Sequence, residues 1–337
     1  MFLPNTKIHI PRCMTPTESF VEHYPQAKDF ANNQLKCLWF PDEVKLEKDI
    51  QSIKVEMTEA EAHGVITVLR LFTLYELKAG NYWTGKTLNA FPRPEIMRMA
   101  SIFGAFELGI HQPFYARLNE LLNLNTDEFF LSYVTDPLLK DRMDFVSDVV
   151  KSTNYLESIG AFSMIEGAVL YSSFAYLKHF QVNGKNKLLN VVRGINFSAV
   201  DENQHTIAGG WLYNLLKNEL LNDNRNSKTE VEDYIGKSER MLTESAHKIY
   251  EHESYIVDMI FEKGQVEGIT STQLKHFVES RINMCLDALG IAKPFKVNYN
   301  PIADWFYDGL NNYQSVDFFS GIGREYSREW TANEFAW

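Results

Sequence analysis

Cysteine is scarce in this sequence: only Cys13, Cys37 and Cys285 occur among 337 residues. Because these residues are widely separated, they form neither a disulfide framework nor a CxxC metal or redox pair. Such sparse use of cysteine is typical of proteins in a reducing compartment, and we expect a cytoplasmic protein.

Dense runs of Lys and Arg are also lacking, and the formal net charge is -11. Proteins that bind phosphate backbones or anionic membranes usually display clustered positive charge, so we expect no direct binding to nucleic acid. No stretch reaches the roughly 18 uninterrupted apolar residues that a membrane-spanning helix needs. The first residues, MFLPNTKIHIPRC, do not follow the pattern of a signal peptide. We therefore expect a soluble, unprocessed protein without a membrane partner.

Sustained alternation of apolar and polar residues, the pattern of β-strands, is absent as well. Apolar residues instead recur at helical spacing in long segments. The first segment opens with TEAE at residues 58–61, which is typical of a capping box, and extends to about Leu88. The other predicted helices cover residues 94–123, 126–150, 153–181, 186–221, 229–262 and 270–289. Long helices with short connections predict an all-α helical bundle.

The helical pattern fades from about Pro301, and the remaining residues are rich in aromatic side chains. We expect two parts, a helical domain over residues 1–300 and a tail over residues 301–337 that docks to a partner. The final segment, REWTANEFAW, supplies apolar and aromatic anchors for docking, although it could equally pack on the protein's own surface.

Four glutamates lie in segments whose other residues indicate burial. The segments LFTLYEL, FGAFELGIH, FSMIEGAVL and FSAVDENQH contain Glu76, Glu107, Glu166 and Glu202, respectively. An unpaired buried carboxylate would take up a proton, and several together repel one another unless cations lie among them. Lys and Arg are nearly absent from these segments. Two metal ions would balance the four carboxylates, and oxygen ligands with imidazoles suit iron or manganese.

Glu202 and His205 form an ExxH motif, whose two side chains lie on one face of a helix. Two helices with single glutamates and two with ExxH motifs are typical of di-iron and di-manganese carboxylate bundles. Taken singly, a glutamate in an apolar helix often reaches the surface, and an ExxH motif occurs frequently by chance. The ordered set of four along one helical chain is far more specific.

The sequence resembles the small subunit of class I ribonucleotide reductase from about residue 38 to about residue 305. The segments that carry the resemblance are LWFPDEV, TEAEAHGVITVLRLFTLYE, IEGAVLYSSF and VDENQH. The resemblance implies a ferritin-like helical bundle with a dinuclear metal site in its core, with residues 1–300 as the radical-generating domain. The metal ligands that it implies are Glu76, Glu107, His111, Glu166, Glu202 and His205. Iron is the expected metal, with two manganese ions or a mixed pair as alternatives.

The second ligand helix departs from the family pattern. His111 and Tyr115 keep the family's spacing, but Leu108 occupies the place of the usual glutamate and Glu107 lies one residue earlier. An extra residue in a helix can be absorbed by a π-bulge, and Pro113 favours a distortion between Gly109 and Tyr115. We therefore predict Glu107 as the ligand, and the alternative is a site without this carboxylate.

The resemblance also implies the chemistry of a ribonucleoside-diphosphate reductase. Tyr115 lies one helical turn beyond His111 and would be oxidised by the metal centre to a tyrosyl radical. Leu170 and Phe174 would shield this radical from water and reductants. An ordinary core tyrosine is the alternative interpretation, since the chain contains 16 tyrosines.

The implied route of the radical leads through His111, Asp201 and Trp39 toward a tyrosine of the tail. Tyr326 is the predicted tail tyrosine, with Tyr313 as the alternative. The large subunit would then use the radical to reduce ribonucleotides to deoxyribonucleotides. The implied partners are the large subunit, a second copy of this chain in a homodimer and, as a further candidate, a flavodoxin-like activating protein.

Two other classes of protein share this ligand set. A ferritin-like di-iron oxygenase or desaturase would use it to attack an organic substrate, and an iron-storage protein would bind the metal without catalysis. The presence of Trp39, Asp201 and Tyr115 together favours a radical relay over both classes.

Overall fold

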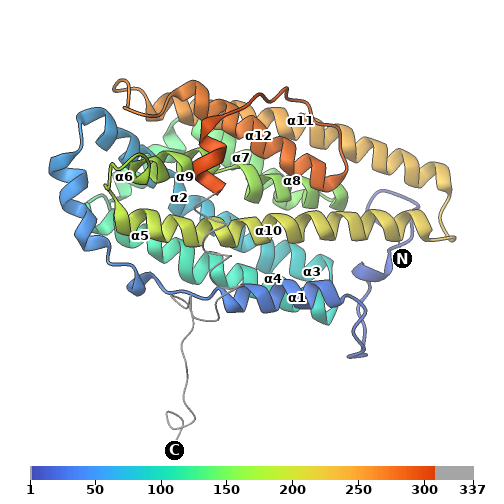
Figure 1. The fold of residues 1–337 in the computed structure, drawn as a ribbon. Coiled ribbons are helices and arrows are strands. Elements are labelled where there is room, and N and C mark those ends of the chain that lie inside the picture. The colour runs from blue at the N-terminus through green and yellow to red at the C-terminus, as the bar shows by residue number, and fades with distance from the viewer. Residues whose placement is uncertain (1, 308–337) are drawn as a thin grey trace, which may run out of the picture.

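The computed structural model describes residues 2–307, and over this range the chain consists of helices joined by short connections (Figure 1). The only β pairing within this range is two isolated bridges. The α-helices are α1 (Pro25–Lys36), α2 (Glu59–Asn81), α3 (Leu88–Ala90), α4 (Pro94–Phe106), α5 (Gln112–Leu121), α6 (Asp127–Thr135), α7 (Pro137–Lys151), α8 (Tyr155–Ala168), α9 (Tyr171–Lys178), α10 (Leu189–Asn222), α11 (Lys228–Ile260) and α12 (Ser271–Leu289). The expected all-α fold is confirmed. None of the described helices combines the length and the apolar character that crossing a membrane requires.

The central helix of the bundle is α8. Every residue from Ser158 to Ala168 is buried, and the helix packs against α7, α10, α11 and α12. In Figure 1, α10 runs the length of the molecule, with α11 and α12 above it and α1 and α4 below it. A helix that is enclosed on all sides has no face toward water. Any polar side chain that it carries must therefore find its partners inside the bundle.

Thr58 and Glu61 set the start of α2. The Thr58 hydroxyl accepts a hydrogen bond from the backbone N–H of Glu61, and the Glu61 carboxylate accepts one from the backbone N–H of Thr58. These reciprocal bonds satisfy donors that have no partner within the first turn of the helix. The predicted capping box is thereby confirmed.

Two π-helices lengthen the helices that lead to the core. The first, η5 (Tyr82–Thr87), continues α2, and the second, η6 (Glu107–His111), joins α4 to α5 without a break. The chain therefore stays helical over both predicted segments, 58–88 and 94–123. The first segment becomes a π-helix near its end, and the second near its middle.

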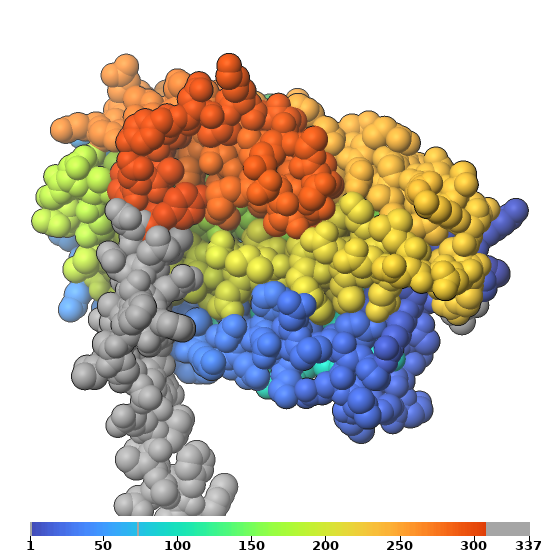
Figure 2. All heavy atoms as spheres, turned by 45° about the vertical axis from the view of Figure 1, so that its right-hand side comes forward, coloured from blue at the N-terminus to red at the C-terminus, as the bar shows by residue number. Residues whose placement is uncertain are grey.

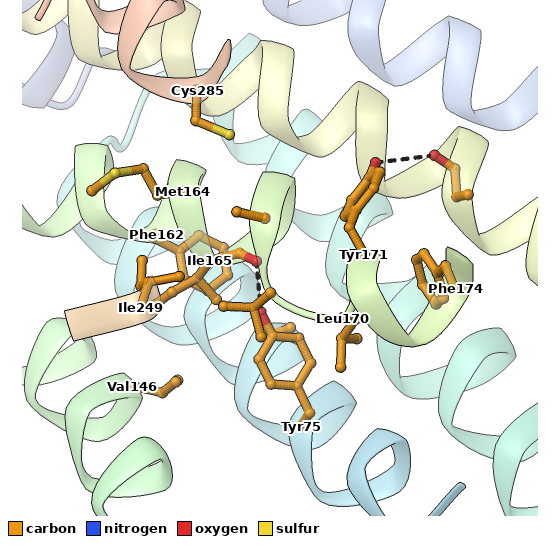
Figure 3. Close-up of a cluster of buried hydrophobic side chains, with 14 of the residues drawn as sticks. Tyr75, Val146, Phe162, Met164, Ile165, Leu170, Tyr171, Phe174, Ile249 and Cys285 are labelled. Carbon is orange, nitrogen blue, oxygen red and sulfur yellow. Dashed lines mark hydrogen bonds between the residues drawn. The ribbon is translucent and has the colours of Figure 1, made fainter. Parts of the chain in front are cut away.

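Two helices that were predicted as continuous are divided in the structure. The segment 126–150 is divided at Asp136, whose side chain caps α7, and Pro137 begins that helix. The segment 153–181 is divided between α8 and α9 at Leu170, whose φ of 72° lies in the left-handed region. A non-glycine residue pays a steric cost of about 1–2 kcal/mol there. Leu170 is 1% exposed, so packing in the core holds this turn (Figure 3).

The sequence did not predict α1, which packs against α4. Its buried residues are only Ala27, Ala31 and Gln34. Two alanines and a glutamine make a weak apolar stripe, and the helical period was therefore not visible in the sequence.

The first residues of the expected tail pack on the bundle. Residues 301–307 are helical, and Phe306 is fully buried with its ring centroid 4.9 Å from that of Phe277 in α12. Lys178 of α9 donates a hydrogen bond of 3.0 Å to the Phe306 carbonyl. The segment forms part of the red surface in Figure 2, while Phe306 points into the bundle. The predicted tail tyrosines, Tyr326 and Tyr313, lie outside the described residues.

Candidate metal centre

Four helical segments converge in the middle of the bundle and carry six acidic or imidazole side chains. Glu76 comes from α2, Glu107 and His111 from η6, Glu166 from α8, and Glu202 and His205 from α10. Each of these residues is at most 2% exposed. The structure thus brings together all six residues that were predicted as metal ligands.

The six side chains form two overlapping groups. One group consists of Glu76, Glu107, His111 and Glu202, and the other of Glu107, Glu166, Glu202 and His205. Within each group, one ligand atom per residue lies within 4.8 Å of all the others. Because Glu107 and Glu202 belong to both groups, each can bridge two ions. This arrangement fits a dinuclear centre with two shared carboxylates.

Both histidines direct Nδ1 into the cluster. His111 Nδ1 lies 2.9 Å from Glu107 Oε2 and 3.2 Å from Glu202 Oε1. His205 Nδ1 lies 2.6 Å from Glu107 Oε1 and 3.6 Å from Glu202 Oε2. Glu76 Oε2 is 3.8 Å from Nδ1 of His111. The two histidines therefore face the shared carboxylates from opposite halves of the cluster.

The π-helix η6 accounts for the unusual spacing of the second ligand segment. Its i→i+5 hydrogen bonds accommodate one extra residue, so Glu107 and His111 meet at a separation of four residues where the family pattern has three. Leu108, at the family's usual glutamate position, packs over the backbone of Gly80 and is 37% exposed. The predicted π distortion is confirmed, and it begins at Glu107 rather than at Gly109.

Burial sets the electrostatics of the cluster. It raises the pKa of Glu76 and of Glu166 well above the usual value, and neighbouring carboxylates raise both further. Burial disfavours a charge on His111 and His205 as well, but the surrounding carboxylates, Glu107 foremost, together more than offset it, so the pKa of each histidine is raised. Without cations, protons would supply the positive charge that the cluster needs. Two divalent ions would supply this charge instead and displace the protons.

Several buried ligand atoms have no hydrogen-bond partner among the described residues. These atoms are both carboxylate oxygens of Glu76, Oε1 of Glu107, Oε2 of Glu166, Oε2 of Glu202 and both ring nitrogens of His205. Buried polar atoms are nearly always hydrogen-bonded, and an unpaired carboxylate oxygen is especially costly. Coordination of metal ions would satisfy the unpaired atoms that face the centre of the cluster.

Asp201 connects the cluster to Trp39. Its Oδ2 lies 3.0 Å from Nε2 of His111 and accepts a hydrogen bond of 2.9 Å from Nε1 of Trp39. The Trp39 ring also stacks on the His111 ring, with centroids 6.0 Å apart. Sequence analysis missed Gln34, whose Nε2 donates a hydrogen bond of 2.6 Å to Oδ1 of Asp201. No sequence signal marks Gln34, which is one amide in a largely polar helix.

Tyr115 lies in an apolar pocket and is fully buried. Its ring centroid is 4.4 Å from that of Phe72, which in turn lies 5.6 Å from that of Phe174. Leu170 and Phe174, the expected shield, are both buried at the turn between α8 and α9 (Figure 3). Burial raises the pKa of Tyr115 well above its usual value, so the phenol keeps its proton at neutral pH.

Trp83 of η5 is a second residue that sequence analysis missed. Its Nε1 donates a hydrogen bond of 3.0 Å to Oε1 of Glu166, and its ring lies edge-on to that of His205 at 5.9 Å. Trp83 follows Glu76 by seven residues, which is two turns along one helical face. This spacing is the signal that could have revealed it.

Known proteins share both the sequence pattern and the fold. The family model of the ribonucleotide reductase small chain matches residues 17–301. The "Probable ribonucleoside-diphosphate reductase small subunit" of Invertebrate iridescent virus 3 is 27% identical over 334 residues, which cover 93% of this chain and 85% of that protein. The beta subunit of ribonucleoside-diphosphate reductase from Bacillus subtilis is 25% identical, covering 89% and 88%. The crystal structure of dimanganese(II)-NrdF from Streptococcus sanguinis has a TM-score of 0.72 at 20% identity, covering 88% of this chain and 99% of that chain. This chain belongs to the ribonucleotide reductase small-chain family.

Proposed function

We propose that this chain holds two metal ions in the cluster, forms a tyrosyl radical at Tyr115 and passes it to the large subunit of a class I ribonucleoside-diphosphate reductase. The observation that carries the proposal is the pair of four-residue groups that share Glu107 and Glu202. A shared pair of carboxylates between two histidines is suited to two ions rather than one.

The donor atoms fit two hard cations. Glu76 and His111 would hold one ion, Glu166 and His205 would hold the other, and Glu107 and Glu202 would bridge them. Glutamate oxygens and imidazole nitrogens suit iron and manganese. Four carboxylates also match the charge of two divalent ions, which removes the cost of burying unpaired negative charge.

Tyr115 is the proposed site of the radical. When bound and oxidised, the metal pair supplies the oxidant that accepts one electron from the phenol. Glu76 is the carboxylate whose charge acts most strongly on Tyr115, and it is our proposed acceptor of the phenolic proton. The apolar rings around Tyr115 keep water and reductants away from the phenoxyl oxygen.

Asp201 and Trp39 are the proposed route outward. Asp201 holds the imidazole of His111 and the indole of Trp39 by one oxygen atom, so the two rings remain stacked. We propose that the radical leaves through Trp39 and continues to Tyr326 in the tail. In this proposal, residues 1–300 generate the radical and residues 301–337 dock to the large subunit.

Iron is the proposed metal, with manganese or a mixed pair as the second candidate. The NrdF structure from Streptococcus sanguinis has the same fold and is named as the dimanganese(II) form, which supports manganese as a candidate. A small chain of ribonucleotide reductase acts with a large subunit. A homodimer, a flavodoxin-like activating protein for the manganese form and a cytoplasmic location complete the proposal.

Electron paramagnetic resonance of aerobically metal-loaded protein tests the proposal. We expect about two metal ions per chain by elemental analysis and a tyrosyl signal that Tyr115→Phe abolishes. Tyr82→Phe is the matched control, because Tyr82 is equally buried but bonds Ser158 outside the cluster. Full metal occupancy without a radical, under either metal, would point instead to an oxygenase or a storage protein.

A further inference from the structure

Two buried hydroxyl groups next to the candidate metal centre have no hydrogen-bond partner within residues 2–307. They are the phenol of Tyr115 and the side chain of Ser198, both in residues that are 0% exposed. Leaving a buried hydroxyl unpaired costs about 1–3 kcal/mol. Two such groups side by side would remove this cost by bonding to each other.

Ser198 lies on the face of α10 that points to the cluster. It precedes Asp201 by three residues and Glu202 by four, so these side chains share one side of the helix. The Ser198 hydroxyl therefore lies one helical turn before Glu202, a proposed metal ligand.

The Ser198 hydroxyl forms no hydrogen bond within α10. Serine and threonine in helices commonly donate to the carbonyl four residues earlier, as Thr206 of α10 does to Glu202. Ser163 of α8 likewise donates to a neighbouring helix, to the Thr206 carbonyl. Ser198 has no such acceptor.

The packing of their two segments places Ser198 opposite Tyr115. His111, one turn before Tyr115, contacts Glu202, one turn after Ser198. Gly194, one turn before Ser198, lies against the ring of Phe114, the neighbour of Tyr115.

We infer that Ser198 Oγ–H is the hydrogen-bond donor to the Tyr115 phenol oxygen, and that it stays the donor when that oxygen becomes a phenoxyl radical. The inference rests on the function proposed above, since it concerns the radical form of Tyr115.

The chemistry of the radical fixes the direction of this bond. Oxidation converts the phenol to a phenoxyl radical, releasing one electron to the oxidised metal pair and one proton toward Glu76. Before oxidation, either hydroxyl can donate to the other. Afterwards the phenoxyl oxygen can only accept, so Ser198 must donate. The hydrogen bond withdraws electron density from the phenoxyl oxygen and thereby lowers the largest g value of the radical.

Electron–nuclear double resonance in D2O tests the inference without measuring turnover. Metal-free protein is equilibrated in D2O and then loaded with metal, so that the Ser198 hydroxyl carries deuterium. We expect one strongly coupled exchangeable deuteron on the Tyr115 radical. In Ser198→Ala this coupling is lost and the largest g value rises, while Ser198→Thr retains both. Ser163→Ala, which removes another buried hydroxyl, leaves the coupling unchanged.

Several results would overturn the inference. A Tyr115 radical without a coupled deuteron in the unmodified chain would show that no donor reaches it. A coupling that persists in Ser198→Ala, with the metal content still about two per chain, would assign the donor to water or another group. If the unmodified chain forms no tyrosyl radical at all, the proposed function itself fails, which the same spectrum distinguishes from the first two results.

Discussion

The indole nitrogen of Trp83 donates a hydrogen bond of 3.0 Å to Oε1 of Glu166. This bond leaves Oε2 of the same carboxylate facing His205, 3.7 Å from Nδ1. Trp83 therefore determines which oxygen of Glu166 points toward the cluster. Groups that orient a metal ligand in this way usually matter almost as much as the ligand itself.

Trp83→Phe should weaken the binding of the ion that we propose Glu166 and His205 to hold. The ring is kept but the N–H donor is lost, so Glu166 is free to rotate, and we expect about 10–100-fold lower affinity for that ion. Calorimetric titration of metal-free protein measures it. Trp211→Phe is the matched control, because Trp211 also donates from its indole, to Gln26 away from the cluster. Equal affinities in both variants would show that Trp83 does not position Glu166.

Trp39→Phe should separate formation of the radical from its use. Phenylalanine is not oxidised under these conditions, whereas the cluster and Tyr115 remain in place, so the tyrosyl signal should persist while reductase activity with the large subunit is lost. Gln34→Leu removes the bond to Asp201 Oδ1 and keeps the indole, and we expect a smaller loss of about 10-fold. Full activity of Trp39→Phe would exclude the proposed route.

Gly194→Ala should destabilise the fold beside Tyr115. A Cβ atom at Gly194 of α10 would lie 2.2 Å from Cζ of Phe114, a fully buried ring. We expect a loss of about 1–3 kcal/mol in the free energy of unfolding, measured with urea. Gly236→Ala is the control, because only Arg240 Nη1 lies near its added Cβ, at 3.6 Å, and an alanine should stabilise that helix slightly. The double variant Gly194→Ala/Phe114→Leu should recover part of the lost free energy of unfolding, because the smaller leucine makes room for the added Cβ atom.

Lys178 should make stability depend on pH. Burial lowers the pKa of Lys178 from its usual 10.5 to about 7. Between these values the unfolded chain binds a proton at this residue that the folded chain does not, so this lysine makes the folded state more stable as pH rises from about 7 to about 10.5. Below pH 7 the folded chain carries the full cost of a buried charge.

Lys178→Met should therefore stabilise the protein by about 1–3 kcal/mol at neutral pH, with a gain that shrinks toward pH 10. The lost bond to the Phe306 carbonyl offsets part of this gain. Urea unfolding at pH 7 and pH 9.5 measures the difference, with the exposed Lys228→Met as control. A constant difference between Lys178→Met and the unmodified chain at both pH values would contradict the prediction.

The buried cluster of four glutamates could be predicted because ionised side chains are normally excluded from a protein core. A glutamate such as Glu76 or Glu166 in an apolar segment is costly unless something compensates its charge, and that conflict is visible in the sequence alone. The π-helix was also predictable, because Glu107 lies one residue earlier than the family's ExxH spacing requires and Pro113 cannot donate a helical hydrogen bond. The first prediction came from a local conflict between residue type and burial, and the second from a departure in spacing from the family pattern.

Contacts between distant segments could not be predicted in the same way. Gln34 meets Asp201 across 167 residues, and Trp83 meets Glu166 across 83. Neither residue conflicts with its own surroundings in the sequence. The division of the predicted helix at Leu170 was missed for a related reason, because neither glycine nor proline marks the turn, and core packing holds it instead.

The π-helix at Glu107–His111 also affects how relatives of this protein can be found. It preserves the convergence of the two side chains in space while changing their separation along the chain from three residues to four. A search that requires ExxH in both pairs would pass over this chain although all six side chains converge in its core. One inserted residue is thus enough to hide a centre from a fixed motif, and distances between side chains are the safer criterion for divergent members of the family.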